Sequence, residues 1–240
     1  MSKPFHFKEF TVAQDRCAMK IGTDGVLLGA WVSLENNPQT ILDIGTGTGL
    51  IALQLAQRSL AETIDAVEID NEAYEQCTSN FEESPWADRL FCYHASIQEF
   101  ASEIDETYDL IISNPPFYSE DYKTENDARD LARFTDALPF QHLIVCAAHL
   151  LSETGVFALI LPKKEEENFN KLAAEHGLYP TRICHVKGTF TSEVKRSLLT
   201  FSKEHKTPTV ESLVIETGRH QYTDAYKNIV NAFYLDKNLG

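Results

Sequence analysis

The sequence predicts an α/β protein built on a doubly wound, mostly parallel sheet, and three observations lead to this prediction. Apolar runs alternate with helical patterns between residues 40 and 161. A cluster of glycines follows the first of these runs, and after Pro180 the apolar runs come closer together. A strand that is followed by a helix and another strand pairs in parallel, so helices should cover both faces of the sheet.

The parallel part of the sheet is predicted from five apolar runs. These runs cover residues 40–44, 63–69, 90–94, 108–113 and 156–161. The spacing of apolar residues between the runs predicts helices over residues 50–58, 72–82 and 138–151. Pro139 suits the first turn of the last helix, because a proline there removes no helical hydrogen bond.

The C-terminal part follows a different pattern. Three apolar runs separated by short segments predict antiparallel hairpins, over residues 181–187, 197–202 and 212–216. Apolar residues then recur at helical spacing, at Tyr226, Ile229, Val230, Phe233 and Tyr234. We expect one amphipathic helix there, with this stripe packed on the sheet.

The chain shows no division into parts. No repeat, low-complexity stretch or linker interrupts the 240 residues, so we expect a single domain over 1–240 with an N-terminal extension over 1–38. No apolar run approaches the roughly 18 residues of a membrane span, and we expect a cytoplasmic monomer without a membrane partner. The five cysteines are far apart and form no C-x-x-C pair, which excludes a readable disulfide framework or metal site.

Charge is distributed unevenly along the chain. The sequence has 21 Lys and Arg against 36 Asp and Glu, a formal net charge of −15, which argues against a simple basic-patch nucleic-acid binder. Residues 61–180 alone carry −18, whereas residues 181–240 carry +3. The net charge therefore does not exclude an RNA contact through the C-terminal region, where Lys187, Lys195 and Arg196 are the candidates.

The glycines after the first strand predict a ligand site. They lie in the segment Asp43-Ile44-Gly45-Thr46-Gly47-Thr48-Gly49, and glycines at the carboxyl end of a parallel strand let the backbone approach a ligand. The spacing is G-x-G-x-G, whereas a dinucleotide site requires G-x-G-x-x-G. A carboxylate at Asp43 would repel a pyrophosphate but can pair with the cationic end of S-adenosylmethionine. We therefore predict a methyl-donor site that includes all seven residues.

The next two strands supply further candidate contacts to the donor. The second strand ends at Glu68, followed by Ile69 and Asp70, and an acid there can accept the ribose hydroxyls. We choose Glu68 before Asp70. The third strand is followed by Ser96 and Ile97, which could meet the adenine ring. The alternative for Ser96 is that it only caps the following helix.

The fourth strand is followed by Asn114-Pro115-Pro116-Phe117, which we predict as the catalytic motif. The prolines fix the backbone and remove two donors, so the Asn114 side chain and the Pro115 carbonyl are held as acceptors. Two acceptors can grip a planar amino group and turn its nitrogen lone pair toward the methyl group. This is positioning and electrostatic preorganisation, because an amide takes no proton at neutral pH. Phe117 offers a flat face for stacking a base.

The glycine segment and the Asn114-Pro115-Pro116-Phe117 motif together resemble the class I S-adenosylmethionine-dependent methyltransferases that modify exocyclic amino groups. The segment from Phe10 to Trp31 and the tail from Tyr222 to Leu235 resemble the bacterial tRNA(Val) adenine-N6 methyltransferases, so that the similarity covers nearly the whole chain. It implies a Rossmann-like, seven-stranded sheet and methylation of N6 of the adenosine 3′ of the anticodon, at position 37.

Two further implications concern single sites. In the family that the chain resembles, the segment Thr23-Asp24-Gly25 lies over the methionine part of the donor, whereas the bland alternative is a helix start capped by Thr23 or Asp24. Ser96 departs from the family pattern, because an Asp is expected there. The long polar segment 118–136 is a candidate functional loop in which Arg129 or Arg133 touches RNA.

Three other functions remain open at this stage. Methylation of a guanine N2 in ribosomal RNA and methylation of a glutamine side-chain amide in a protein use the same Asn-Pro-Pro-aromatic motif. A protein that holds a nucleoside cofactor without turnover, such as an RNA-folding factor, is the non-enzymatic alternative. The resemblance of the N-terminal segment favours tRNA. An unpaired loop base is easily splayed out into a pocket, which suits a site made of a stacking ring and two acceptors.

Overall fold

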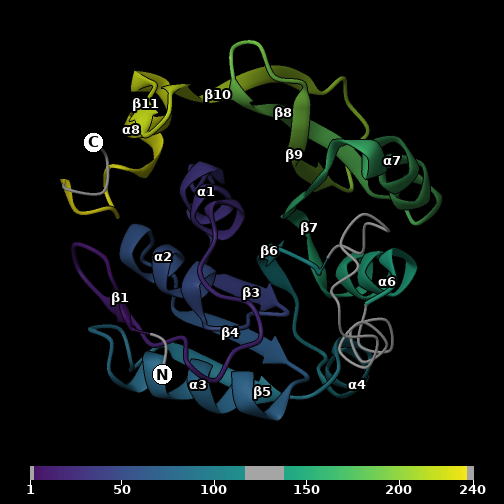
Figure 1. Ribbon diagram of the computed structural model, residues 1–240. Coiled ribbons are helices and arrows are strands. Elements are labelled where there is room, and N and C mark those ends of the chain that lie inside the picture. Colours follow the sequence, from purple (N-terminus) through teal and green to yellow (C-terminus); the bar gives the residue numbers. More distant parts are fainter. Residues whose placement is uncertain (1–2, 117–137, 237–240) are drawn as a thin grey trace, which may run out of the picture.

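The computed structural model describes residues 3–116 and 138–236, which form an α/β fold (Figure 1). Within these residues one sheet has nine strands in the order β11-β10-β8-β9-β7-β6-β3-β4-β5. The predicted α/β class is confirmed. The expected count of seven strands is too low, because the C-terminal part contributes four strands to the sheet, including the short β11 (Gln221–Tyr222).

The parallel part of the sheet follows the predicted runs closely. Its strands are β3 (Thr40–Ile44), β4 (Thr63–Glu68), β5 (Leu90–His94), β6 (Tyr108–Ser113) and β7 (Leu151–Pro162). Neighbouring strands pair in parallel throughout this half. Their carboxyl ends consequently meet along one edge of the sheet, which is where ligands bind in folds of this kind.

The C-terminal strands differ from the expected hairpins in one respect. β8 (Tyr179–Thr189) pairs antiparallel with β9 (Val194–Ser202), as predicted. β10 (Thr209–Gly218) pairs in parallel with β8 and not with β9, so the hairpin expectation is wrong for this strand. The reason is that β9 is already flanked by β7 and β8, which leaves only the open edge of β8.

Helices cover both faces of the sheet (Figure 1). On one side lie α1 (Thr23–Trp31), α2 (Leu50–Arg58), α3 (Asn71–Glu82) and α8 (Asp224–Val230). On the other side lie α4 (Ile97–Glu103), α6 (Phe140–Leu150) and α7 (Glu166–Glu175). The predicted C-terminal helix is shorter than its apolar stripe, since α8 ends at Val230, although Phe233 is still fully buried.

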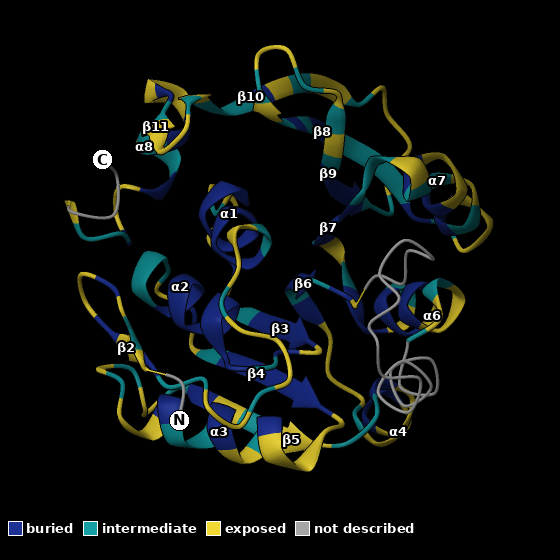
Figure 2. Ribbon diagram, viewed as in Figure 1, coloured by how far each residue is buried: buried dark blue, intermediate teal, exposed yellow. Residues whose placement is uncertain are grey.

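The sheet separates two hydrophobic cores, which Figure 2 shows as the buried residues on either side of it. Successive side chains of a strand point to opposite faces, so Ile41 enters one core and Leu42 the other. The N-terminal extension joins the first core through Phe7, Phe10 and Val12, and its two short strands β1 (Phe5–His6) and β2 (Thr11–Val12) pair with each other.

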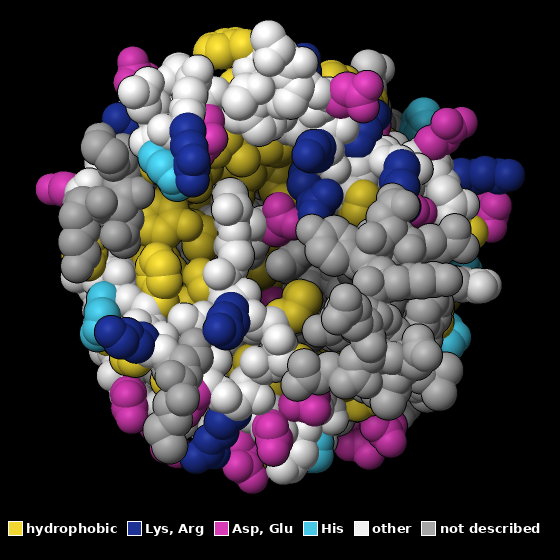
Figure 3. Space-filling view, viewed as in Figure 1, with side chains coloured by type: hydrophobic (Ala, Val, Ile, Leu, Met, Phe, Trp, Pro, Cys, Tyr) yellow, Lys and Arg dark blue, Asp and Glu magenta, His cyan; other side chains and the backbone are white. Residues whose placement is uncertain are grey.

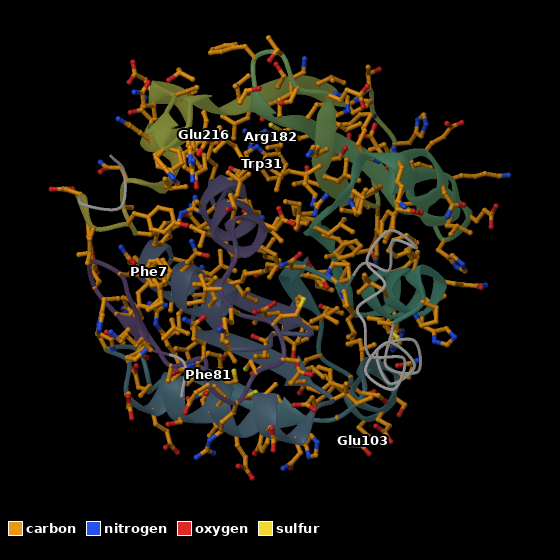
Figure 4. All side chains as sticks on the ribbon, viewed as in Figure 1. Phe7, Trp31, Phe81, Glu103, Arg182 and Glu216 are labelled. Atoms are coloured by element: carbon orange, nitrogen blue, oxygen red, sulfur yellow. The ribbon has the colours of Figure 1, made fainter. Side chains whose placement is uncertain are left out.

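Helix α1 lies between α2 and the β8–β10 end of the sheet (Figure 1). Trp31 at its carboxyl end packs under the guanidinium of Arg182, 4.3 Å from the ring centroid, and both are labelled in Figure 4. The amino end starts from Gly22, which makes no side-chain cap bond. The proposed capping by Thr23 or Asp24 is therefore wrong, because Asp24 instead pairs with Arg196 of β9.

Candidate active site at the carboxyl edge of the sheet

Four loops meet at the carboxyl edge because their strands pair in register. Ile44 of β3 is paired with Val67 of β4 and with Ser113 of β6, and Glu68 pairs with His94. The hydroxyl of Ser113 donates to the Ile44 carbonyl over 2.8 Å, which fastens the end of β6 to the end of β3. The glycine segment, the residues after Glu68, the Ser96 turn and the Asn114 motif are thus neighbours, as the sequence predicted.

The glycine loop needs residues without side chains. Gly45 and Gly47 have φ values of +69° and +56°, a region that favours glycine, and a Cβ built on either would meet no atom within 4 Å. The loop backbone therefore borders open space. Thr46 and Thr48 are buried; the Thr46 hydroxyl is bonded to Asp43, and the Thr48 carbonyl accepts from Asn80. These threonines can reach a ligand mainly through their backbones.

Asp43 is fully buried beneath the loop. Its Oδ2 accepts a 2.6 Å hydrogen bond from the Thr46 hydroxyl, whereas its Oδ1 has no hydrogen-bond partner among the described residues. Burial, with a smaller contribution from the negative charge of Glu68, raises the pKa of this carboxyl to about 7, although the hydrogen bond from Thr46 acts to lower it. A buried carboxylate oxygen without a partner is expensive, so a cationic group at the loop would stabilise the ionised form.

Glu68 ties the glycine loop to the end of β4. Its Oε2 accepts from the amide of Gly47 over 2.8 Å, and its Oε1 accepts from the amides of Ile69 and Asp70, each over 2.9 Å. A carboxylate has about four acceptor positions, so this geometry leaves room for one more donor. Asp70, the second choice for this role, instead caps α3 by accepting from the amide of Ala73.

The Ser96 turn is occupied by a helix cap. The Ser96 hydroxyl accepts from the amide of Glu99, and the Glu99 carboxylate accepts from the Ser96 amide, which forms a capping box. The capping alternative considered for Ser96 is thus observed. Ile97 is buried in the core with 4 % of its surface exposed, whereas the apolar side chain of Ile69 is 57 % exposed at the same edge.

Two polar residues of α3 hold the N-terminal segment over the site, and the sequence analysis did not single them out. Asn80 accepts from the amide of Ala13 and donates to the carbonyls of Ala13 and Thr48. Gln76 accepts from the amides of Asp15 and Arg16. Both side chains are buried. Polar residues on the apolar face of a predicted helix could have identified them, because buried polar groups need hydrogen-bond partners.

Cysteine 17 lies at the end of this segment. Burial, together with the negative charges of Glu68 and Asp70, raises the pKa of the Cys17 thiol to about 12. Because these charges act at short range, the raised pKa agrees with a position of the segment close to the end of β4. The N-terminal extension thus approaches the same edge as the glycine loop.

The acceptor motif begins beside α1. Asn114 is half-buried and directly follows β6, and Pro115 is buried behind it. A Cβ built on Gly25 would lie 3.8 Å from the Asn114 Nδ2 and 3.3 Å from a methyl group of Leu50. The first turn of α1 therefore lies beside the acceptor motif, and the tight approach at Gly25 is to Leu50. Phe117, the fourth residue of the motif, lies outside the described residues.

The candidate RNA-binding residues separate into two groups. Lys187, Lys195 and Arg196 lie together where β8 ends and β9 begins, and Lys195 is exposed. The Nε of Arg196 lies 2.8 Å from the Oδ2 of Asp24. Arg196, predicted to contact RNA, is thus paired with Asp24, predicted to contact the methyl donor. Arg129 and Arg133 lie outside the described residues.

Two negative findings apply to residues 3–116 and 138–236. None of the helices there is long and apolar enough to cross a membrane. Over the same residues, no group of three or more His, Cys, Asp or Glu side chains is arranged to hold a metal ion.

Comparisons with known proteins agree on one family. Residues 24–175 match the model of the methyltransferase small domain. A protein of Flavobacterium psychrophilum, named tRNA1(Val) (adenine(37)-N6)-methyltransferase, is 61 % identical over 96 % of this chain and 99 % of its own length. A protein of the same name from Parabacteroides distasonis is 44 % identical over 98 % of this chain and 99 % of its own length.

Solved structures share the fold at low sequence identity. A predicted O-methyltransferase of Agrobacterium tumefaciens superposes with a TM-score of 0.68 at 20 % identity, over 88 % of this chain and 96 % of the other. The ribosomal protein L11 methylase of Lactobacillus delbrueckii superposes with a TM-score of 0.53 at 17 % identity, over 75 % of this chain and 77 % of the other. At these identities the likeness concerns the fold alone.

Proposed function

This chain belongs to the family of the tRNA1(Val) (adenine(37)-N6)-methyltransferases, and from that membership we propose that it methylates N6 of adenosine 37 in tRNA1(Val). The observation that carries the proposal is the position of Asn114 and Pro115, at the end of β6 and next to the glycine loop. The whole chain, 1–240, acts as one methyltransferase domain in which the extension 1–38 completes the donor site.

S-adenosylmethionine is the donor that the site fits. The glycine loop borders open space. The buried Oδ1 of Asp43 has no hydrogen-bond partner in the described part of the chain, and a cationic ligand would supply the missing interaction. Glu68 has room for a ribose hydroxyl, and the exposed Ile69 offers an apolar face to the adenine. Thr23, Asp24 and Gly25 would border the methionine part, and the backbone of residues 44–49 would surround it. When bound, S-adenosylmethionine supplies an electrophilic methyl group.

The residues of this chain position the acceptor amine. The Asn114 side-chain oxygen and the Pro115 carbonyl accept the two hydrogens of the adenine amino group, which withdraws the nitrogen lone pair from the ring. The lone pair then points toward the donor site, next to the first turn of α1. Asn114 takes no proton, so the proton displaced by methylation leaves to water. Pro116 keeps the backbone rigid, and we propose that Phe117 stacks on the adenine.

The tRNA would approach along the same edge. Lys187, Lys195 and Arg196 lie where β8 ends and β9 begins, at the same edge of the sheet as the acceptor motif, and are the proposed phosphate contacts among the described residues. Arg129 and Arg133 stay in the proposal from the sequence alone. A single chain contains every residue used here, so we propose a monomer, and its tRNA substrate places the reaction in the cytoplasm.

The product of the reaction tests this proposal. We expect that the purified protein, incubated with isotopically labelled S-adenosylmethionine and total tRNA, forms labelled N6-methyladenosine in tRNA(Val), identified by mass spectrometry. Ribosomal RNA and a glutamine-containing protein extract serve as parallel substrates. Labelled N2-methylguanosine or methylglutamine would overturn the substrate, and donor binding without any labelled product would favour a non-enzymatic RNA factor.

A further inference from the structure

A cavity of about 550 Å³ lies beside the proposed active site. It is bordered by the amino end of α1, by the ends of β8 and β10, by the start of β9, and by α8 with the residues after it. Its volume is within the range of small-ligand pockets. In Figure 3 a hollow in this region exposes apolar side chains, with Lys and Arg side chains at its rim.

The topology places this cavity on the same edge as the acceptor motif. β7 is parallel to β6 and antiparallel to β9, and β8 is antiparallel to β9, so β8 runs in the same direction as β6. β10 is parallel to β8 and shares that direction. The end of β10 at Glu216 and the start of β9 at Lys195 therefore face the same way as Asn114.

The first turn of α1 lies between the cavity and the acceptor site. Thr23 and Asp24 line the cavity, whereas the next residue, Gly25, borders Asn114. Asp24 and Arg196, which form an ion pair, both line the cavity. A polymer that enters the acceptor site with one unit can consequently place a neighbouring unit in the cavity.

The lining has the chemistry of a nucleobase site. Tyr222 and Tyr234 contribute half-buried aromatic rings. Tyr226 is only 2 % exposed and supports Tyr222, since the two rings are stacked with centroids 5.2 Å apart. Every base has a face that stacks on such rings. Glu216 can accept from the N–H groups of a base, and Lys195 can reach its phosphate. Asp24 and Glu216 balance Arg196 and Lys195, so the cavity does not select a free anion.

We propose that this cavity binds a second base of the tRNA, an unpaired and unmethylated nucleotide of the anticodon loop near the methylated adenosine. The inference rests on the proposed function and adds a specificity subsite to it. Its occupant is a base and not the methyl donor, because the glycine loop and Glu68, which hold most of the donor, lie at the ends of β3 and β4 and do not line the cavity. Only Thr23 and Asp24 border both sites. The enzyme would then recognise its substrate by two splayed bases.

Abasic substitution tests this subsite. We would prepare anticodon stem–loop RNAs in which each loop nucleotide except the methylated adenosine is made abasic in turn. With the wild-type protein, one abasic position should raise KM about tenfold, the effect of losing one aromatic stack. With the Tyr222→Ala variant, KM for the intact RNA should rise by the same factor. The abasic RNA should then raise KM no further, because the variant and the abasic position remove the same contact. Affinity for S-adenosylmethionine and kcat should stay within about twofold.

Matched variants make the result decisive. Tyr222→Phe keeps the ring and should behave as the wild type, and Tyr179→Ala removes a tyrosine from the opposite end of β8. If Tyr222→Ala does not fold, Tyr222→Leu gives the same comparison, because it removes the aromatic ring and keeps a bulky apolar side chain. Equal KM for all abasic RNAs, or penalties that simply add to those of the variants, would overturn the subsite. Failure of the wild type to form N6-methyladenosine would instead overturn the proposed function.

Discussion

Asn114 is the residue on which the proposed chemistry depends. Asn114→Ala removes one of the two acceptors for the amino group, and we expect kcat to fall by at least about 10²-fold, the order of effect of losing one preorganised polar contact. Donor binding should remain within a few-fold, because the glycine loop is untouched. Single-turnover assays and calorimetry measure the two quantities separately. Normal turnover by the variant would contradict the assigned role.

Asp43 gives a prediction about pH and stability. Its pKa is about 7 in the folded protein and close to 4 in the unfolded chain, so the folded state binds the proton more tightly between these values. The stabilisation from this protonation is complete below pH 4 and is lost as the pH rises through 7. The Asp43→Asn variant has no carboxyl group to titrate at this position, so its stability does not fall in this way. Relative to the wild type, the variant should gain about 1–4 kcal/mol of unfolding free energy from pH 4.5 to 7.5.

Urea unfolding at several pH values measures this difference. Parallel pH profiles for the two proteins would contradict the raised pKa. The same variant should bind S-adenosylmethionine about tenfold more weakly at pH 7.5, because it lacks the carboxylate that would compensate the donor's positive charge. Unchanged affinity in calorimetry would remove Asp43 from the proposed donor site.

At the scale of elements, the glycine loop is held against α3 by a close approach. Gly49 has φ = +80°, and a Cβ there would lie 2.6 Å from the Phe81 ring and 3.0 Å from the Cys77 sulfur. Gly49→Ala should therefore cost about 2–5 kcal/mol of stability. Gly22→Ala is the control, since its Cβ would meet no atom closer than 4.0 Å and its φ is negative. Thermal unfolding measures both variants. An equal loss of stability in Gly49→Ala and Gly22→Ala would contradict this packing argument.

The β8–β9 hairpin gives the second prediction at this scale. Lys187→Gln with Lys195→Gln should weaken tRNA binding and lower the slope of log affinity against log salt by about 1–2, as expected for two phosphate contacts. Arg196 is left in place because it pairs with Asp24. The control is Lys203→Gln with Lys206→Gln, the same charge change beyond the opposite end of β9. Identical salt slopes for the two double variants would move the RNA surface elsewhere.

The sequence predicted helices and strands correctly where the local pattern of apolar residues decides the structure. The runs predicted for β3, β5, β6 and α2 match the observed bounds, because buried strands and an amphipathic helix have distinct periodicities. α7 was not predicted. β10 was predicted as a strand but with the wrong partner, because pairing depends on which sheet edge is still open and not on the residues of the strand itself.

The whole molecule carries a formal net charge of −15, so general attraction to nucleic acid should be weak. We expect binding to an unrelated RNA of the same length to be at least about 10²-fold weaker than binding to tRNA(Val) at physiological salt, as for proteins that combine modest electrostatics with shape recognition. Competition binding measures this ratio. Equal affinity for the two RNAs would show that charge, and not the two proposed base sites, controls recognition.

The sequence by itself determined the α/β class, the glycine loop with Asp43 and Glu68, and the Asn114 motif, because these depend on residue type and on spacing over a few positions. Only the tertiary structure decided that Asp43 has a buried oxygen without a hydrogen-bond partner among the residues described, that Glu68 accepts from the Gly47 amide of the loop, and that Asp24 pairs with Arg196. Asp24 and Arg196 are 172 positions apart. Contacts at such separations are set by the order of the strands and the packing of α1, which no local pattern encodes.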